Sequence, residues 1–180
     1  MPVFFASDIH FGHDKLRTFY PDTRGSFSTV ERLDAHIITE WNKTIGQDDD
    51  VYVLGDLGGG HPKHLDSCLA QLNGNKVLVT GNHDKKTWQG VKHHFVEVHQ
   101  AYHEEWFGDQ FVVMCHYPIW EWNAMSRGAY HVHGHLHGKP HGIPGRILDV
   151  GIDNHNLRPF TYDDIVRFMD SREIRKHNVQ

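Results

Sequence analysis

VFFASDIHFGH, residues 3–13, sets a pattern that the rest of the chain repeats. Its first four residues form a short apolar run typical of a buried strand, and the polar Asp8 and His10 follow at once. Further runs of this kind are VYVL (51–54), KVLVT (76–80), FVVMC (111–115), YHVH (130–133) and RILDV (146–150). The pattern predicts several buried strands that end in polar loops.

Amphipathic helices are predicted between these strands. Residues 30–45 place apolar side chains at intervals of three and four, and Ser28 with Glu31 forms a capping-box pattern at the start. Two more helices are predicted over about 63–73 and from Thr161, with Asp164 as its capping partner, to about Arg175. Strands that alternate with helices in the first half favour parallel pairing.

The second half has closely spaced strands that favour antiparallel pairing. Residues 99–107 read as one strand that joins 111–115 through a Gly108-Asp109 hairpin. No repeat, linker or low-complexity segment divides the chain. We therefore expect a single domain over residues 1–180.

Composition narrows the class of protein. The chain has 18 histidines in 180 residues and a net charge of −5, and its two cysteines, Cys68 and Cys115, form no paired motif. A disulfide framework and a thiolate zinc site are not expected. No apolar run approaches the ~20 residues of a membrane span, and none resembles a signal-peptide core. We expect a soluble, cytoplasmic protein with no membrane partner, and the acidic balance argues against non-specific nucleic-acid binding.

Polar residues of metal-ligating type follow five of the predicted strands. In open α/β sheets ligands bind outside the carboxyl ends of the strands, so these side chains can meet at one rim. They are Asp8, His10, Asp56, Asn82, His116, His135 and His137. Mixed carboxylate, amide and imidazole donors suit Mn, Fe, Zn or Ni better than Mg or Ca. Seven ligands are too many for one tetrahedral ion, but they suffice for two ions that share a carboxylate.

The ordered series Asp8-x-His10, Gly55-Asp56, Gly81-Asn82-His83-Asp84, His116 and Gly134-His135-x-His137 resembles the calcineurin-like metallophosphoesterases over residues 3 to about 155. It is most similar to their short, single-domain bacterial and phage type. The resemblance implies an α/β fold, a four-layer αββα sandwich of two mixed β-sheets flanked by helices, with the dimetal site at the carboxyl ends of the strands.

The same resemblance implies a role for each ligand. Asp8, His10 and His137 would hold a first divalent ion, Asp56 would bridge, and Asn82, His116 and His135 would hold a second. Mn²⁺ is the expected metal, with Fe, Zn or Ni as alternatives. His83 would assist the leaving group as a catalytic residue, with Asp84 as its orienting partner.

Departures from the family pattern narrow the substrate. The phosphoprotein phosphatases carry a phosphate-clamping arginine after their Gly-Asp, whereas this chain reads GDLGGG and then GNHD. A phosphoprotein substrate is therefore not expected. His13 and Arg127 are the candidate substrate-binding residues, and Trp120 or Trp122 would either stack on a nucleobase or pack in the core. His131 and His133 either support the ligands from behind or are ordinary core residues.

These inferences favour an enzyme, a metal-dependent phosphodiesterase. It would hydrolyse a small or nucleotide-like phosphoester by attack of a metal-bridging hydroxide. Three alternatives remain: a single-strand nuclease on the same fold, a non-catalytic metal-binding scaffold, and a histidine-rich metal buffer. Because protons compete with metal for imidazole, activity is expected to fall below about pH 6. The oligomeric state is not indicated by the sequence.

Overall fold

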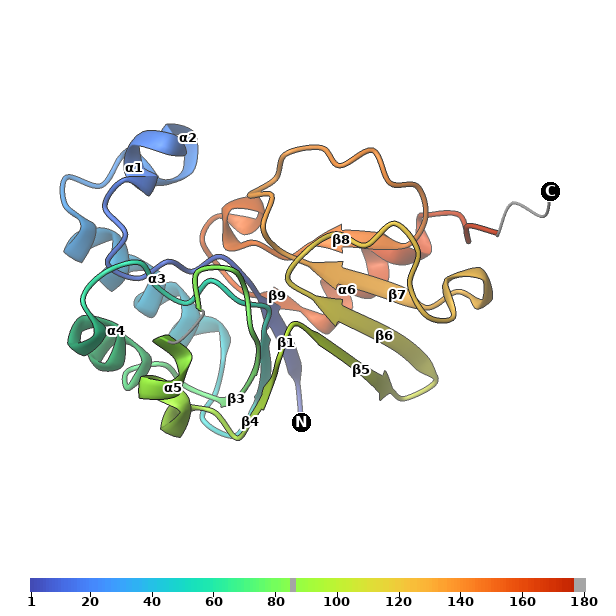
Figure 1. Ribbon diagram of the computed structural model, residues 1–180, viewed down its shortest axis with the longest axis horizontal. Coiled ribbons are helices and arrows are strands. Elements are labelled where there is room, and N and C mark those ends of the chain that lie inside the picture. Colours follow the sequence, from blue (N-terminus) through green and yellow to red (C-terminus); the bar gives the residue numbers. More distant parts are fainter. Residues whose placement is uncertain (85–86, 177–180) are drawn as a thin grey trace.

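The computed structural model describes residues 1–84 and 87–176, and two mixed β-sheets form its centre (Figure 1). The first sheet has the strand order β4-β3-β2-β1-β9. These strands are β1 (Val3–Ala6), β2 (Asp50–Val53), β3 (Asn75–Val79), β4 (Glu97–His99) and β9 (Phe160–Thr161). Strands β1 to β4 are parallel, as the alternation of strands and helices predicts, and only β9 is antiparallel to its neighbour β1.

The second sheet has the order β5-β6-β7-β8. Its strands are β5 (Tyr102–Phe107), β6 (Gln110–Cys115), β7 (Tyr130–His133) and β8 (Ile147–Asp149). The hairpin β5-β6 is antiparallel as expected, but β6, β7 and β8 run parallel. The prediction of antiparallel pairing was wrong for these three strands, because the connections 116–129 and 134–146 cross over instead of turning back.

The predicted strand 99–107 is in fact two strands in different sheets. β4 ends at His99, which pairs with Val79 in the first sheet, whereas β5 begins at Tyr102 and pairs with Cys115 in the second. Between them Ala101 has a left-handed φ of 67°. The chain passes from one sheet to the other at this turn.

Helices cover the outer face of the first sheet. The principal ones are α3 (Val30–Thr44), α4 (Pro62–Leu69) and α5 (Thr87–Val91), which lie together on one side of that sheet in Figure 1. The others are α1 (Leu16–Phe19), α2 (Pro21–Arg24) and α6 (Tyr162–Asp170), with 3₁₀ turns at Lys92–His94, Met125–Arg127 and Ile152–His155. In the described part of the chain no helix combines the length and apolar character that crossing a membrane requires.

Capping residues fix where the helices begin. The N-cap of α3 is Thr29, whose hydroxyl accepts from Arg32 N at 3.3 Å, so the prediction of Ser28 missed by one residue. The capping box of Thr161 and Asp164 at α6 is confirmed. That helix ends at Asp170, however, five residues before the predicted end.

Side chains that alternate along the strands divide the core. In β1, Phe4 and Ala6 pack toward the helices, while Phe5 points between the two sheets. The outer face of the second sheet packs against Trp122 and Met125 of the β6-β7 connection. The structure thus has two mixed sheets flanked by helices, and it brings the carboxyl ends of β1, β2, β3, β6 and β7 toward one rim.

Candidate metal centre

All seven predicted ligands lie together at this rim, which we call the strand-end site. β1 is followed by Asp8 and His10, β2 by Asp56, β3 by Asn82, β6 by His116, and β7 by His135 and His137. Most of them line a cavity of about 260 Å³, whose wall is His10, His13, Leu16, Phe19, Tyr20, Asp56, Asn82, His83, His135 and His137. Asp8 and His116 are fully buried.

Distances divide the strand-end site into two groups around Asp56. In the first group His10 Nε2 and His137 Nε2 lie 3.9 and 3.6 Å from Asp8 Oδ1. In the second, His116 Nε2 lies 2.9 Å from Asn82 Oδ1. The rings of His116 and His135 have centroids 5.2 Å apart. Oδ2 of Asp56 is 3.5 Å from both His10 Nε2 and His116 Nε2, which is a bridging position.

Two buried atoms of the first group have no hydrogen-bond partner among the described residues. They are Asp8 Oδ1 and His10 Nε2. A buried polar atom without a partner costs about 1–3 kcal/mol, so such atoms call for an explanation. A cation between them would satisfy both. The donor set therefore fits a metal ion.

The backbone at the strand-end site is strained. Five of the seven predicted ligands have left-handed φ angles between 50° and 74°, namely Asp8, His10, Asp56, His135 and His137. Residues other than glycine adopt this region rarely, and such strain gathers at functional sites. The predicted ligands themselves therefore occupy the tight turns at the ends of the strands.

Two glycines allow these loops to approach one another. A Cβ at Gly134 would collide with the side chains of Ser7 and Asp8, and one at Gly81 would collide with Asp56 Oδ1. Neither glycine has a positive φ. Their contribution is therefore space for close approach between loops, not a special backbone angle.

Hydrogen bonds from behind orient the ligand imidazoles. His116 Nδ1 lies 2.7 Å from Leu54 O, and His137 Nδ1 lies 2.7 Å from Asp153 Oδ2. An Nδ1–H donated to oxygen leaves Nε2 as the free acceptor, which is the arrangement of metal-binding histidines. Both Nε2 atoms consequently face the strand-end site.

Arg24 and Asp153 are the residues that the sequence reasoning missed. Arg24 is fully buried and donates to Asp8 O, Ile9 O and both carboxylate oxygens of Asp153. Burial acts to raise the pKa of Asp153, but hydrogen bonds from His137 and Arg24 hold it below its ordinary value. Arg24 lies in a polar segment with no motif around it, so no local signal marks it.

Asp84 braces the loop that carries Asp56. Its Oδ2 accepts from Asp56 N and Gly81 N, and its Oδ1 accepts from Leu57 N. Burial raises its pKa, whereas these backbone donors lower it. Because both oxygens are directed at backbone, the geometry supports a positioning role for Asp84 in place of the expected partnership with His83.

His83 and His13 stand at the mouth of the strand-end site. The His83 side chain is 46% exposed, with Nε2 4.0 Å from Asp56 Oδ2, and its backbone N donates to Asp56 Oδ1. His13 Nδ1 lies 3.5 Å from His10 Nδ1. Burial lowers the pKa of His13. Both histidines can therefore meet a substrate in the cavity.

Burial also decides where protons sit at the centre of the strand-end site. It raises the pKa of Asp8 to about 6 and lowers the pKa of His10 well below its usual value. The pKa of His135 is lowered as well, again by burial. Uptake of a proton near pH 6 consequently falls on the Asp8 carboxylate and not on the His10 imidazole.

The other predicted substrate residues lie away from the strand-end site. Arg127 lines a separate cavity of about 360 Å³. Trp122 is buried and donates to Ala129 O, while the exposed Trp120 stacks under Arg175 with 4.3 Å between cation and ring. Arg127 does not line the strand-end cavity, because the β6-β7 connection packs against the outer face of the second sheet, and its role in substrate binding stays a prediction.

His131 and His133 are buried behind the ligands. His131 Nδ1 lies 3.0 Å from Val113 O, and its Nε2 accepts from Ile119 N in the segment after His116. Burial lowers its pKa to about 3, so it stays neutral. His133 Nδ1 lies 2.8 Å from Gly134 O. His131 thus fixes the loop after one ligand, and neither imidazole belongs to the two groups.

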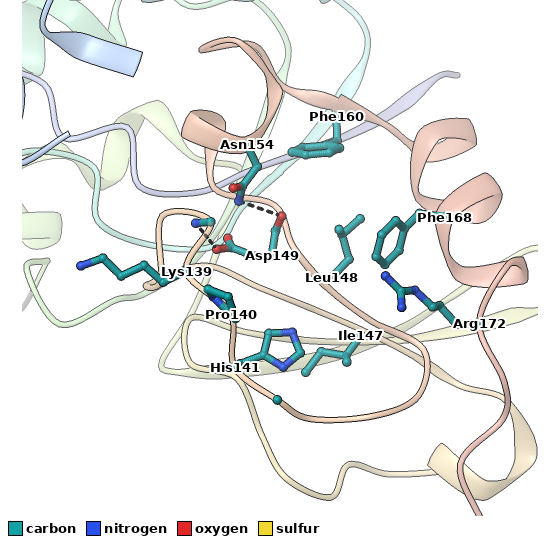
Figure 2. A pocket seen from close by; sticks show the side chains of 12 residues that line it. Lys139, Pro140, His141, Ile147, Leu148, Asp149, Asn154, Phe160, Phe168 and Arg172 are labelled. Carbon is teal, nitrogen blue, oxygen red and sulfur yellow. Dashed lines mark hydrogen bonds between the residues drawn. The ribbon is translucent and has the colours of Figure 1, made fainter. Parts of the chain in front are cut away.

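A larger cavity of about 580 Å³ lies beside the strand-end site (Figure 2). One end of this cavity is lined by Lys139, Asp149 and Asn154, and the other end by Phe168 and Arg172. Asp149 Oδ2 accepts from Gly138 N, directly after His137. This wall of the cavity therefore supports the turn that carries a predicted ligand.

Comparisons with known sequences give no family assignment. No protein-family model matches the chain. An uncharacterised protein of Methanocaldococcus jannaschii is 28% identical over 96% of this chain and 93% of its own length. The gene 66 protein of Mycobacterium phage L5 is 35% identical over 85 residues, 46% of this chain and 39% of the phage protein. The match thus spans less than half of the phage relative.

Comparison with solved structures bears on the fold. A protein of unknown function from Aquifex aeolicus, AQ665, matches with a TM-score of 0.74 and 21% identity over 93% of this chain and 98% of that one. This likeness shows a shared fold. YfcE, a phosphoesterase from E. coli, matches with a TM-score of 0.46 and 20% identity over 84% of this chain and 78% of its own.

Proposed function

We propose that the protein is a dinuclear-metal-dependent phosphohydrolase of the calcineurin-like type. Its reaction would be the hydrolysis of a small or nucleotide-like phosphodiester. One observation carries the proposal: two nitrogen-rich groups of ligands meet at Oδ2 of Asp56, 3.5 Å from a histidine of each group. Two ions that share a carboxylate are the arrangement that clamps the two oxygens of an in-line phosphoryl displacement.

The residues would divide into two sets of ligands. Asp8, His10 and His137 would hold one divalent ion, Asn82, His116 and His135 the other, and Asp56 both. When bound, two such ions supply a water of lowered pKa and positive charge for the phosphoryl oxygens. Mn²⁺ is the proposed metal because the donors mix oxygen with imidazole nitrogen and include no thiolate.

The protein's own side chains would act on the substrate from the mouth of the cavity. The His83 imidazole is accessible and lies beside Asp56, where it can give a proton to the departing oxygen. Tyr20 stacks on the His137 ring at 4.2 Å and closes one wall. A cavity of about 260 Å³ at the strand ends accommodates a phosphoester group.

The test is turnover of a bis-aryl and a mono-aryl phosphate by metal-stripped protein with added Mn²⁺. Wild type is expected to cleave the diester faster. The activity of Asp56→Asn should be more than about a hundredfold lower than that of wild type. Mutation of residues that only support metal ligands already lowers metal affinity or activity by about 10–100-fold. Asp66→Asn changes a half-exposed carboxylate outside the strand-end site and serves as the matched control.

Two outcomes contradict the proposal. One is the absence of turnover of either ester by wild type that holds metal. The other is equal activity of wild type and Asp56→Asn. Elemental analysis adds an independent check: at least two tightly held ions per chain agree with the proposal, and many weakly held ions indicate a metal buffer instead.

A further inference from the structure

A second group of ligating side chains lies between α3 and α4, which we call the helix-pair cluster. It consists of Asp34 on α3 with His64 and Cys68 on α4. Residues four apart on a helix share a face, so His64 and Cys68 point to the same side. The cluster combines oxygen, nitrogen and sulfur donors, whereas the strand-end site has no sulfur.

The three side chains are within reach of a single ion. Cys68 Sγ lies 3.5 Å from His64 Nε2, and Asp34 Oδ2 lies 2.6 Å from the same nitrogen. Tetrahedral zinc with Zn–S of about 2.3 Å and Zn–N of about 2.0 Å separates sulfur from nitrogen by about 3.5 Å. The short contact between oxygen and nitrogen is a hydrogen bond, which a bound ion would replace after a small separation of the two side chains.

Asp34 is the independent sign of a ligand. Its side chain is only 3% exposed, and its Oδ1 has no hydrogen-bond partner among the described residues. Burial raises the pKa of the Asp34 carboxyl, and it raises the pKa of the Cys68 thiol to about 12. A buried carboxylate and a buried thiolate are costly alone, and a divalent cation would compensate both.

An ion can reach the helix-pair cluster from solvent. A cavity of about 300 Å³ opens between α3 and α4, and all three side chains line it. The His64 side chain is 38% exposed at its mouth. The cavity leaves room for water in the fourth coordination position, which is the open arrangement that zinc adopts with three protein ligands.

We infer that Asp34, His64 and Cys68 bind one zinc-type ion, separate from the two ions proposed at the strand-end site. The ion would join α3 to α4. Asp34 Oδ2 also accepts from Gly12 N at 3.0 Å, in the loop between His10 and His13. A bound ion would therefore hold that loop through Asp34, and binding would release the thiol proton to solvent.

The experiment is titration of the metal-stripped full chain with Co²⁺, followed by absorption. Thiolate ligation to Co²⁺ gives a near-ultraviolet charge-transfer band that carboxylate and imidazole ligands do not give. Wild type is expected to develop this band, and its intensity at saturation should correspond to one thiolate-bound Co²⁺ per chain, whatever amount of Co²⁺ the strand-end site takes up. Asp56→Asn should develop the same band, since the inference does not depend on phosphohydrolase activity.

Matched variants assign the band. Cys68→Ser should abolish it, and Cys115→Ser should leave it unchanged, because the buried Cys115 is outside the helix-pair cluster. His64→Gln, at a partly exposed position, should weaken the Co²⁺ affinity read from the band at least tenfold, and it tests the cluster even if Cys68→Ser does not fold. No band in wild type, or a band that survives in Cys68→Ser, overturns the inference. In that case the cluster is only a contact between His64 and Asp34 beside the buried thiol of Cys68.

Discussion

The strand-end site and the helix-pair cluster gather similar side chains by different means. At the strand-end site, ligands come from five separate loops, and five of the seven have left-handed φ angles. In the helix-pair cluster, His64 and Cys68 occupy regular positions of α4, and Asp34 lies within the regular helix α3. One arrangement depends on the tertiary course of the backbone, and the other on helical spacing and one helix contact.

This difference shows where each region is vulnerable. The strand-end site relies on glycines without room for a Cβ and on buried partners behind its ligands. The helix-pair cluster relies on its own three side chains. Changes to residues that touch no metal should therefore damage the strand-end site, whereas the helix-pair cluster should respond mainly to changes of its ligands.

Asp153→Asn should have the largest effect. It removes the negative charge that pairs with buried Arg24 and that orients His137. Loss of one member of a buried ion pair costs about 3–5 kcal/mol of unfolding free energy. Mn²⁺ affinity should fall by about 10–100-fold, as for other partners behind metal ligands. Urea unfolding and calorimetric titration measure the two effects.

Asp109→Asn is the control for this variant, because Asp109 is exposed in the β5-β6 turn. Its stability should change by less than about 0.5 kcal/mol. Unchanged Mn²⁺ affinity in folded Asp153→Asn would show that the orientation of His137 does not limit binding.

Gly134→Ala should have the second-largest effect. It tests directly whether the strand-end site depends on the close approach of its backbone loops. The added methyl group would collide with Ser7 and Asp8, so the strand-end loops must separate. Overpacking of this kind costs about 1–3 kcal/mol. In contrast, Gly90→Ala in α5 meets no atom within 4 Å and should stabilise slightly, since alanine is the better helix former. Equal urea midpoints for the two variants would contradict the comparison.

Acidification should weaken metal binding at the strand-end site by about tenfold per pH unit below about pH 6. Burial raises the pKa of Asp8 to about 6, so this ligand gains a proton as the pH falls through that value. His10 stays neutral there because its pKa is lowered. Mn²⁺ titrations between pH 7.5 and 4.5 measure the effect. In rate measurements, added Mn²⁺ should move the fall of activity at acid pH to lower pH. If the pH of this fall does not change with Mn²⁺ concentration, competition between protons and Mn²⁺ is excluded.

Arg127→Ala should have the smallest effect, less than about twofold on kcat/KM. Arg127 lines the cavity of about 360 Å³ on the other sheet, and it does not line the strand-end cavity. His13→Ala, at the mouth of the strand-end site, is the matched comparison and should change kcat/KM more. A larger loss of kcat/KM in Arg127→Ala than in His13→Ala would indicate that the β6-β7 connection recognises the substrate.

Much of the fold followed from local sequence. Apolar runs located β1, β2, β3, β6 and β7, and the capping box at Thr161 located the start of α6. Strand β4 was merged with β5 because the left-handed turn at Ala101 carries no glycine to mark it. The short β9 was missed because two residues give no periodic signal.

By itself, the sequence determined which residues follow which strands, because the period of apolar residues and the turn residues are local properties. That was sufficient to select the seven predicted ligands, which the structure brings together at the strand-end site. Only the tertiary structure decided that Arg24 and Asp153 stand behind these ligands, that Asp84 braces backbone, and that Arg127 faces another cavity. These contacts join residues distant in the chain, and no local pattern encodes which distant partner a buried polar group will meet.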